Sequence, residues 1–93
     1  MAIRSFKCAD TEALFEGRRI KRFVNIQSAA MRKLAMLNRA EELDDLRVPP
    51  GNRLESLKGK RSGQFSIRIN DQFRICFLWS SDGPKDVEIV DYH

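Results

Sequence analysis

The sequence is poor in cysteine and histidine, and this scarcity excludes several classes of protein. Its two cysteines, Cys8 and Cys76, are too few for a disulfide scaffold and lack the spacing of metal ligands. The single histidine, His93, is the last residue. No cluster of Asp and Glu side chains suggests a two-metal site. We therefore expect a protein without a metal ion or a cofactor.

Long apolar runs are also missing. The longest uninterrupted apolar stretches are a few residues, whereas a membrane-spanning helix needs about 20. The first six residues, MAIRSF, lack the apolar segment of a secretory signal peptide. We expect a cytoplasmic protein that does not bind membranes. With 93 residues, 42% apolar and 32% charged, the chain is expected to form a single domain, residues 1–93, around one core.

Basic residues outnumber acidic ones and are segregated along the chain. Seventeen Lys and Arg against 13 Asp and Glu give a net charge of +4. Residues 1–40 carry nine basic and three acidic side chains, and residues 53–79 carry six and two. The segments 41–52 and 80–93 are acidic. This segregation favours a polyanionic partner such as nucleic acid, although the solvated surface of a small soluble protein produces the same pattern.

The first half of the sequence has helical features. A short strand at Ile3–Phe6 is expected to precede a helix that Asp10 caps and Gly17 ends. Residues 25–40 form a longer helix, because apolar residues recur at steps of four, four and three. That apolar stripe consists of Ile26, Ala30, Leu34 and Leu37. A short helix at 41–46 follows and ends before Pro49-Pro50-Gly51.

The second half alternates with the period of β-strands. Phe65, Ile67 and Ile69 share one face of a strand, and Phe73, Ile75, Phe77 and Trp79 share one face of the next. The expected strands are 53–57, 64–70, 73–79 and 87–92. Cys76 falls in an expected strand and Cys8 lies just after the one expected at Ile3–Phe6, which favours buried thiols for both. Helices followed by a strand meander predict an α+β fold, with helices packed on one face of an antiparallel sheet.

Three features stand out as candidate sites. Asp91-Tyr92-His93 places a carboxylate, a phenol and an imidazole at the end of a strand. Arg74 interrupts the most apolar strand, so it must reach solvent or meet an anion. Its partner is either a carboxylate of Asp71, Asp91 or Glu88, or a phosphate. The loop 58–63 (KGKRSG) is basic and flanked by glycine, as expected of a solvated hairpin tip or of a loop along a phosphodiester backbone.

The order of several short motifs resembles a known family. RLESLKG at 53–59, GQFSIRIN at 63–70, FRI at 73–75 and the terminal VDYH at 90–93 are similar to the HigB toxins. These toxins belong to the RelE-like superfamily of bacterial type II toxin–antitoxin systems. The resemblance covers essentially the whole chain. It implies a RelE-like α+β fold, in which N-terminal helices pack against a curved antiparallel β-sheet.

The resemblance also implies an activity, partners and site residues. The activity is that of an endoribonuclease that cuts mRNA in the decoding site of the ribosome. The partners are the ribosome, mRNA and a HigA-like antitoxin, with operator DNA bound only through the antitoxin. By position, the functional residues of the family match Lys58, Arg74, Asp91, Tyr92 and His93. One position departs, because this chain has Glu55 where some members have a histidine.

Metal-independent RNA cleavage by the ribose 2′-OH needs a proton acceptor, a proton donor and positive charge on the phosphate. His93 is expected as acid or base, with Asp91 orienting it or acting as base. Arg74 and Lys58 are expected to hold the phosphate, and Tyr92 to stack on a base or donate to an oxygen. Glu55 is either the proton acceptor or a surface partner of Lys58. The expected RNA- and ribosome-binding residues are Arg18, Arg19, Lys21, Arg22, Arg32, Lys33, Lys60, Arg61 and Arg68.

Two other functions are compatible with a basic surface. One is a non-catalytic module that binds RNA or the ribosome. The other is a DNA-binding regulator, but no helix-turn-helix pattern is visible, because residues 41–50 after the long helix are acidic and end in two prolines.

Overall fold

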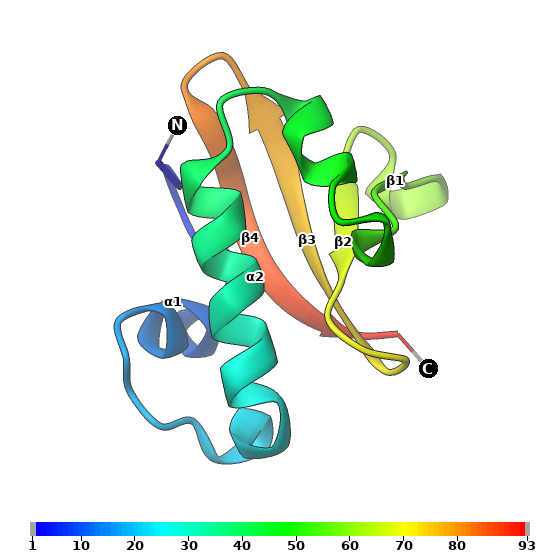
Figure 1. The fold of residues 1–93 in the computed structure, drawn as a ribbon. Coiled ribbons are helices and arrows are strands. Elements are labelled where there is room, and N and C mark those ends of the chain that lie inside the picture. The colour runs from blue at the N-terminus through cyan, green and yellow to red at the C-terminus, as the bar shows by residue number, and fades with distance from the viewer. Residues whose placement is uncertain (1, 93) are drawn as a thin grey trace.

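The computed structural model describes residues 2–92, in which two α-helices pack on one face of a four-stranded sheet (Figure 1). The helices are α1 (Ala9–Phe15) and α2 (Gln27–Arg39). The strands are β1 (Glu55–Ser56), β2 (Phe65–Arg68), β3 (Phe73–Ser80) and β4 (Gly83–Asp91), which pair antiparallel in that order. Short 3₁₀ helices occupy the connections at Lys21–Ile26, Leu43–Arg47, Pro50–Asn52 and Gly59–Arg61. The expected α+β class is therefore confirmed.

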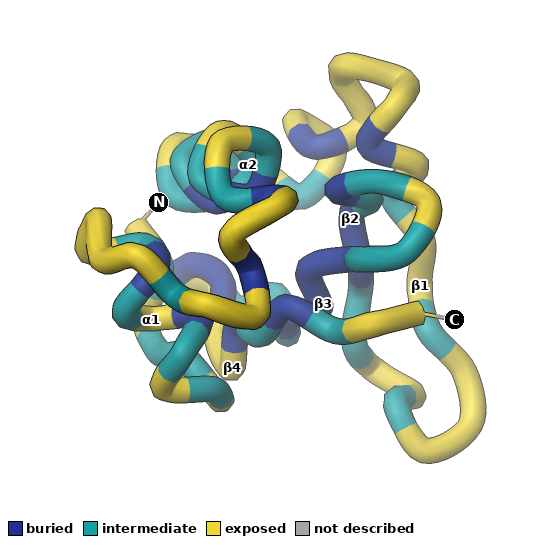
Figure 2. Tube along the Cα trace, turned by 90° about the horizontal axis from the view of Figure 1, so that it is seen from below, coloured by how far each residue is buried: buried dark blue, intermediate teal, exposed yellow. Residues whose placement is uncertain are grey.

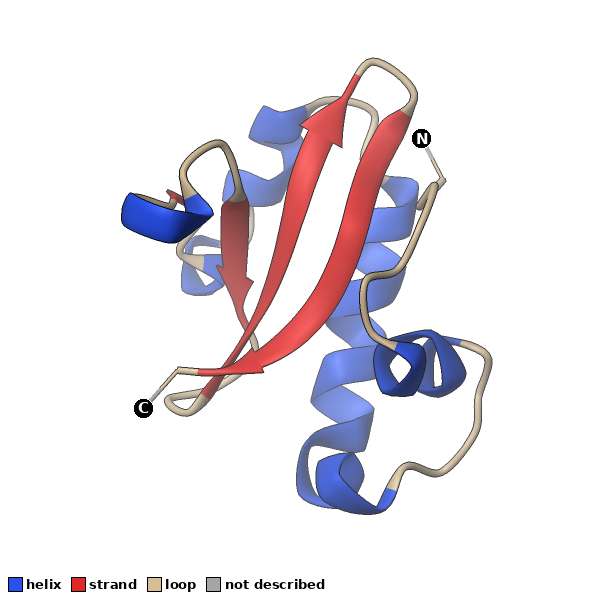
Figure 3. Cartoon of the chain, turned by 180° about the vertical axis from the view of Figure 1, so that it is seen from behind, coloured by secondary structure: helices blue, strands red, loops and turns tan. Residues whose placement is uncertain are grey.

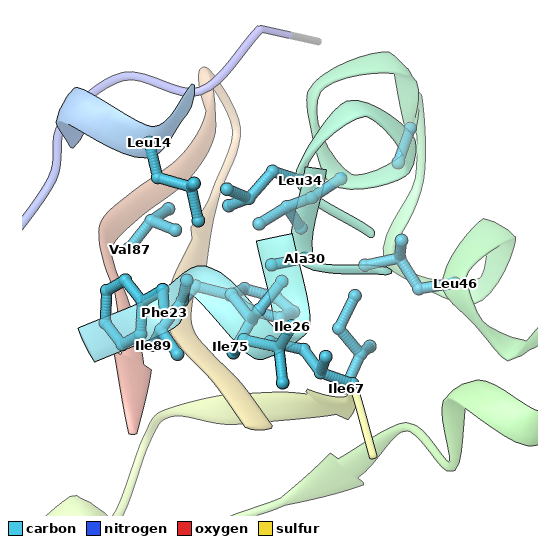
Figure 4. Close-up of a cluster of buried hydrophobic side chains, with 14 residues drawn as sticks. Leu14, Phe23, Ile26, Ala30, Leu34, Leu46, Ile67, Ile75, Val87 and Ile89 are labelled. Atoms are coloured by element: carbon cyan, nitrogen blue, oxygen red, sulfur yellow. The ribbon is translucent and has the colours of Figure 1, made fainter. Parts of the chain in front are cut away.

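The core lies between α2 and the sheet. All four residues of the predicted helical stripe are buried, and three of them are completely inaccessible: Ala30, Leu34 and Leu37. They contact buried sheet residues, among them Ile67, Ile75, Val87 and Ile89 (Figure 4). Burying a side chain such as Leu34 contributes about 1.5–3 kcal/mol to folding. The helix and sheet patterns of the sequence therefore meet in one core.

The alternation along the strands separates two faces of the sheet. The predicted apolar face is confirmed, because Phe73, Ile75, Phe77 and Trp79 all lie in the core or pack against it. The opposite face carries polar residues, and α1 and α2 do not cover it (Figure 3). On this outer face, one cross-strand row consists of Glu55, Ser66, Cys76 and Glu88. The next row consists of Arg68, Arg74 and Val90.

The β3–β4 hairpin is curved, as the family resemblance implied (Figure 3). Its register shifts between Cys76 and Leu78, which is a β-bulge. Asp86, on the bulged strand, has a left-handed backbone with φ of 52°. The Ser5 hydroxyl donates to the Asp86 carboxylate and accepts the Asp86 backbone N–H, which stabilises this conformation. Bulges increase the twist of a strand and bend it.

The N-terminal segment departs from the predictions. Residues 3–6 form no strand, only a parallel bridge from Phe6 to Val87 along the edge of β4. Asp10 does not cap α1, because the helix begins at Ala9 and Cys8 occupies the cap position. The Asp10 carboxylate instead accepts a hydrogen bond from Arg22 Nε at 2.9 Å. Gly17 does end the helix as predicted, with a φ of 95° and a backbone hydrogen bond to Leu14 O.

The other corrections concern strand lengths and one cysteine. The strand expected at 53–57 is only two residues long, and β4 begins at Gly83 rather than at residue 87. It begins earlier because the Ser80–Gly83 pair closes a tight hairpin. Cys76 is buried in β3 as predicted, but Cys8 is half-buried and lies outside any strand. No helix within residues 2–92 is long and apolar enough to cross a membrane.

Candidate active site

Arg74 is the most constrained cation on the outer face of the sheet. Its side chain is 10% exposed. Nε donates to Ser66 Oγ at 2.7 Å, and Nη2 donates to Arg53 O at 2.6 Å and to Ser66 O at 3.3 Å. Nη1 makes no hydrogen bond to any residue in the range 2–92. One edge of the guanidinium is therefore held by the protein, and one nitrogen is left to bind an anion.

The partners of Arg74 differ from those predicted. The carboxylates of Asp71, Asp91 and Glu88 do not pair with it, whereas Glu55 Oε1 lies 3.5 Å from Nη2. Glu55 comes within reach because β1 pairs with β2 and places Glu55 opposite Ser66. Of the two alternatives for Glu55, a pair with Lys58 is not seen among residues 2–92, and the carboxylate contacts Arg74 instead. The Glu55 side chain is 55% exposed, so its carboxylate remains accessible to a substrate.

Arg74 and Glu55 line a shallow depression of about 230 Å³ on the outer face. The other lining residues are Arg53, Arg68, Asn70, Asp71 and Tyr92. Three guanidinium groups and a phenol therefore surround one concave surface, which suits an anionic, aromatic ligand such as a nucleotide. A second depression, of about 370 Å³, is lined by Glu41, Glu42, Leu43, Asp44 and Trp79. Its acidic lining disfavours RNA, so the smaller depression is the candidate site.

The β2–β3 turn lies beside the end of β4 (Figures 1 and 3). Tyr92 N donates to Gln72 O at 2.6 Å, and Gln72 Nε2 donates to Asp91 Oδ2 at 3.0 Å. Asn70 Oδ1 accepts the backbone N–H groups of Gln72 and Phe73, which shapes the turn. Asp91 lies opposite Phe73 in the register and does not line the depression. His93, predicted as acid or base, lies outside the described residues.

The basic loop 58–63 is anchored to the outer face by Arg61. Nη1 of Arg61 donates to Glu88 Oε1 at 2.9 Å and to Gln64 Oε1 at 3.1 Å. Hydrogen bonding to Glu88 raises the pKa of the Arg61 guanidinium, and the two side chains form a partly buried ion pair. Lys58 and Lys60 are exposed on the same loop and do not line the depression.

The remaining predicted RNA-binding cations lie in three places. Around the 3₁₀ helix Lys21–Ile26, Arg18 pairs with Glu16 and Arg22 with Asp10, while Arg19 and Lys21 are exposed. On α2, Arg32 donates to Ser28, one turn earlier. Arg68, on β2, pairs with Asp71 at the rim of the depression.

Lys33, also on α2, contacts the turn that precedes Arg53. Its ammonium donates to the side chain of Asn52, which is completely buried. Burial, together with the positive charges of Arg32 and Arg68, lowers the pKa of the Lys33 ammonium.

Sequence reasoning missed three residues of this site. Ser66 and Asn70 are small polar residues in an alternating strand and a turn, and no local pattern distinguishes them. Arg53 has a left-handed backbone with φ of 45°, which is uncommon for a non-glycine residue. Its carbonyl is the acceptor for Arg74, and its side chain lines the depression. The Gly51-Asn52 dipeptide before it is the available signal, because it marks a turn.

Comparison with known proteins identifies the family. A family model for the RelE-like toxin of type II toxin–antitoxin system HigB matches residues 4–93. Toxin HigB-1 of Vibrio cholerae is 42% identical over 90 residues, which cover 95% of this chain and 94% of that protein.

Solved structures of similar fold agree. A YoeB/ParE toxin from Agrobacterium tumefaciens superposes with a TM-score of 0.53 at 19% identity and covers all of both chains. A YoeB dimer from Staphylococcus aureus gives a TM-score of 0.52 at 18% identity, over all of this chain and 97% of that one. At such identities these likenesses show the fold alone. The family match over residues 4–93 and the 42% identity to the Vibrio cholerae toxin show that this chain belongs to the HigB family of RelE-like toxins of type II toxin–antitoxin systems.

Proposed function

We propose that this toxin is an endoribonuclease that cleaves mRNA on cytoplasmic ribosomes without a metal ion. RelE-like toxins are known for endoribonuclease activity. The observation that carries the proposal is Arg74, whose guanidinium is held by Ser66 and Arg53 through Nε and Nη2, while Nη1 has no hydrogen-bond partner among residues 2–92. Preorganised donors of this kind stabilise charge that develops in a transition state.

The proposed reaction is attack by the ribose 2′-oxygen on the adjacent phosphorus. The 2′-O–P bond forms and the P–O5′ bond breaks, which yields a 2′,3′-cyclic phosphate and a 5′-hydroxyl. One proton leaves the 2′-OH and one is delivered to the 5′-oxygen. Arg74 binds the phosphate and stabilises the pentacoordinate transition state, and Arg53 and Arg68 add positive charge around it.

Glu55 is our proposed proton acceptor. It is adjacent to Arg74 and lines the same depression. The other lining carboxylate, Asp71, is 99% exposed and engaged with Arg68. Asp91 accepts a hydrogen bond from Gln72 and does not line the depression. We therefore propose that it orients the end of the chain and does not take the proton.

The remaining family positions receive auxiliary roles. Tyr92 is 41% exposed at the depression, and we assign it to stacking on a base or donating to a phosphate oxygen. Lys58, on the exposed loop, contacts the phosphate backbone from the side. We assign His93 the donation of a proton to the 5′-oxygen.

The proposed dependence on the ribosome follows from the weak acid–base power of the catalytic groups. An exposed carboxylate and one imidazole provide limited acid–base power, so the rate depends strongly on how well the substrate is aligned. Alignment of reacting groups contributes up to about 7–11 kcal/mol, and the decoding site provides it for mRNA. The basic side chains near Arg19 and Lys21 and on α2 then contact ribosomal RNA.

The family implies an antitoxin partner. We propose that it is a HigA-like protein, and that operator DNA is bound only through it.

Analysis of the cleaved ends tests the proposed function. Purified toxin is incubated with programmed ribosomes and, in parallel, with the same mRNA alone. We expect cleavage on ribosomes, little on free mRNA, and 2′,3′-cyclic phosphate with 5′-hydroxyl ends. Ends with a 5′-phosphate and a 3′-hydroxyl would contradict the proposed chemistry. Ribosome binding without any cleavage would favour the non-catalytic binding module.

A further inference from the structure

We propose that Ser66 is a positioning residue that fixes the guanidinium of Arg74 for transition-state stabilisation. The inference rests on the proposed function and adds a residue that touches no substrate atom itself. Ser66 lies in β2, is completely buried, and is diagonal to Arg74 across the β2–β3 pair. In the view from below, the middle of β2 lies within the buried part of the sheet (Figure 2).

The contacts of Ser66 define the plane of the guanidinium. Its hydroxyl accepts Arg74 Nε at 2.7 Å, and its carbonyl accepts Nη2 at 3.3 Å. Together with the Arg53 carbonyl at 2.6 Å, these acceptors occupy the whole Nε–Nη2 edge. A free arginine side chain samples many rotamers, and ordering it during the reaction would slow the reaction. Ser66 orders it in advance.

A hydroxyl suits this role better than a carboxylate. A buried Asp at position 66 would neutralise the guanidinium and weaken its hold on a phosphate. An Ala would leave the Arg74 Nε–H buried without an acceptor. Glu55 is a poor substitute as an anchor, because it is half-exposed and 3.5 Å away. The neutral hydroxyl therefore orients the charge and leaves its strength unchanged.

The first test compares single-turnover cleavage on programmed ribosomes. Ser66→Ala should lower the maximal cleavage rate about tenfold, the effect of one hydrogen bond to a charged group, and leave the KM for mRNA-loaded ribosomes unchanged. In an Arg74→Lys background, which keeps part of the activity but lacks the Nε that Ser66 binds, the same change should cause no further loss. Ser80→Ala is the matched control, because the Ser80 hydroxyl bonds Gly83 O at 2.7 Å in the β3–β4 turn, away from the depression. It should cleave like the native protein.

The second test does not depend on activity. The Nε–H of Arg74 should exchange with solvent more slowly than that of the exposed Arg39 in ¹⁵N NMR spectra of the native protein. Ser66→Ala should accelerate that exchange at a temperature at which circular dichroism shows both Ser66→Ala and Ser80→Ala to be folded. Fast exchange in the native protein would overturn the proposal even if Ser66→Ala failed to fold. An equal loss of rate with arginine and with lysine at position 74, or a raised KM at an unchanged rate, would also overturn it.

The two tests separate this proposal from the proposed function. Native toxin that fails to cleave on ribosomes refutes the function, and the role of Ser66 in catalysis falls with it. Slow exchange of the Arg74 Nε–H would then still identify Ser66 as a structural anchor. Native toxin that cleaves while Ser66→Ala behaves like Ser80→Ala refutes the role of Ser66 alone.

Discussion

Replacing Glu55 by Gln isolates the proton acceptor from the rest of the site. Glutamine keeps the size of the side chain and can still contact Arg74, but it cannot take a proton from the 2′-OH. We expect the single-turnover rate on programmed ribosomes to fall about 10²–10⁴-fold, which is the usual contribution of a general base. Binding of mRNA-loaded ribosomes should change little.

The structure indicates that this loss does not come from unfolding. The Glu55–Arg74 pair spans 3.5 Å, and the Glu55 side chain is 55% exposed. Such a half-exposed pair contributes roughly 0–1 kcal/mol to stability. For a chain of this size, 1 kcal/mol corresponds to a shift in melting temperature of roughly 4–8 °C. The variant should therefore remain folded at the temperature of the assay.

Glu12→Gln is the matched control for the change in charge. Glu12 is exposed on α1 and does not line the depression. Both variants raise the net charge by one, so any general effect on RNA affinity appears in both. A rate for Glu55→Gln within tenfold of that for Glu12→Gln would refute Glu55 as the base. The role would then pass to His93 with Asp91, and a chain ending at Tyr92 should be the more damaged variant.

Three further predictions follow from the contacts of single residues. Arg74→Ala should abolish cleavage, with Arg74→Lys only partly active, because an ammonium lacks the planar fork. It should also lower the free energy of unfolding by about 1–3 kcal/mol in urea titrations, since buried acceptors at Ser66 and Arg53 lose their donor. Iodoacetamide should alkylate Cys8 and spare Cys76 in the folded protein, as peptide mapping would show. Burial alone would raise the pKa of the Cys8 thiol, but hydrogen bonds from Thr11 and Asp10 and the positive charge of Arg22 outweigh it and lower that pKa overall, so alkylation should begin at a lower pH than for a free cysteine. Burial raises the pKa of the Cys76 thiol, so equal labelling of the two thiols would contradict the structure. Leu34→Ala should destabilise the fold by about 2–5 kcal/mol without a specific effect on the depression. An undiminished melting temperature would refute the assigned core.

The main elements of the fold were predictable because their signals are local. The stripe Ile26, Ala30, Leu34 and Leu37 defines the buried side of α2, and the alternation from Phe73 to Trp79 defines the buried side of β3. Gly17 ends α1 through a left-handed conformation that glycine adopts at little cost. Such features depend on residues within one or two turns of the chain.

The errors have a common physical cause. Asp10 has the chemistry of a helix cap, but Arg22 attracts its carboxylate and the helix begins at Ala9. Residues 3–6 alternate like a strand, yet they pair in parallel along the edge of β4 at a single bridge, Phe6 to Val87. In both cases the outcome depends on a contact with a segment distant in the sequence, which a local pattern does not contain.

The site shows the same division between sequence and tertiary structure. The amino-acid sequence alone shows that Arg74 is a charged residue within an apolar strand, so its guanidinium needs solvent or an anionic partner. Only the tertiary structure decided that the partner is Glu55 rather than Asp71, Asp91 or Glu88. That choice depends on the register of β1 against β2 and on the left-handed turn at Arg53. Register is a property of paired strands, because a shift of one residue moves a side chain to the other face of the sheet.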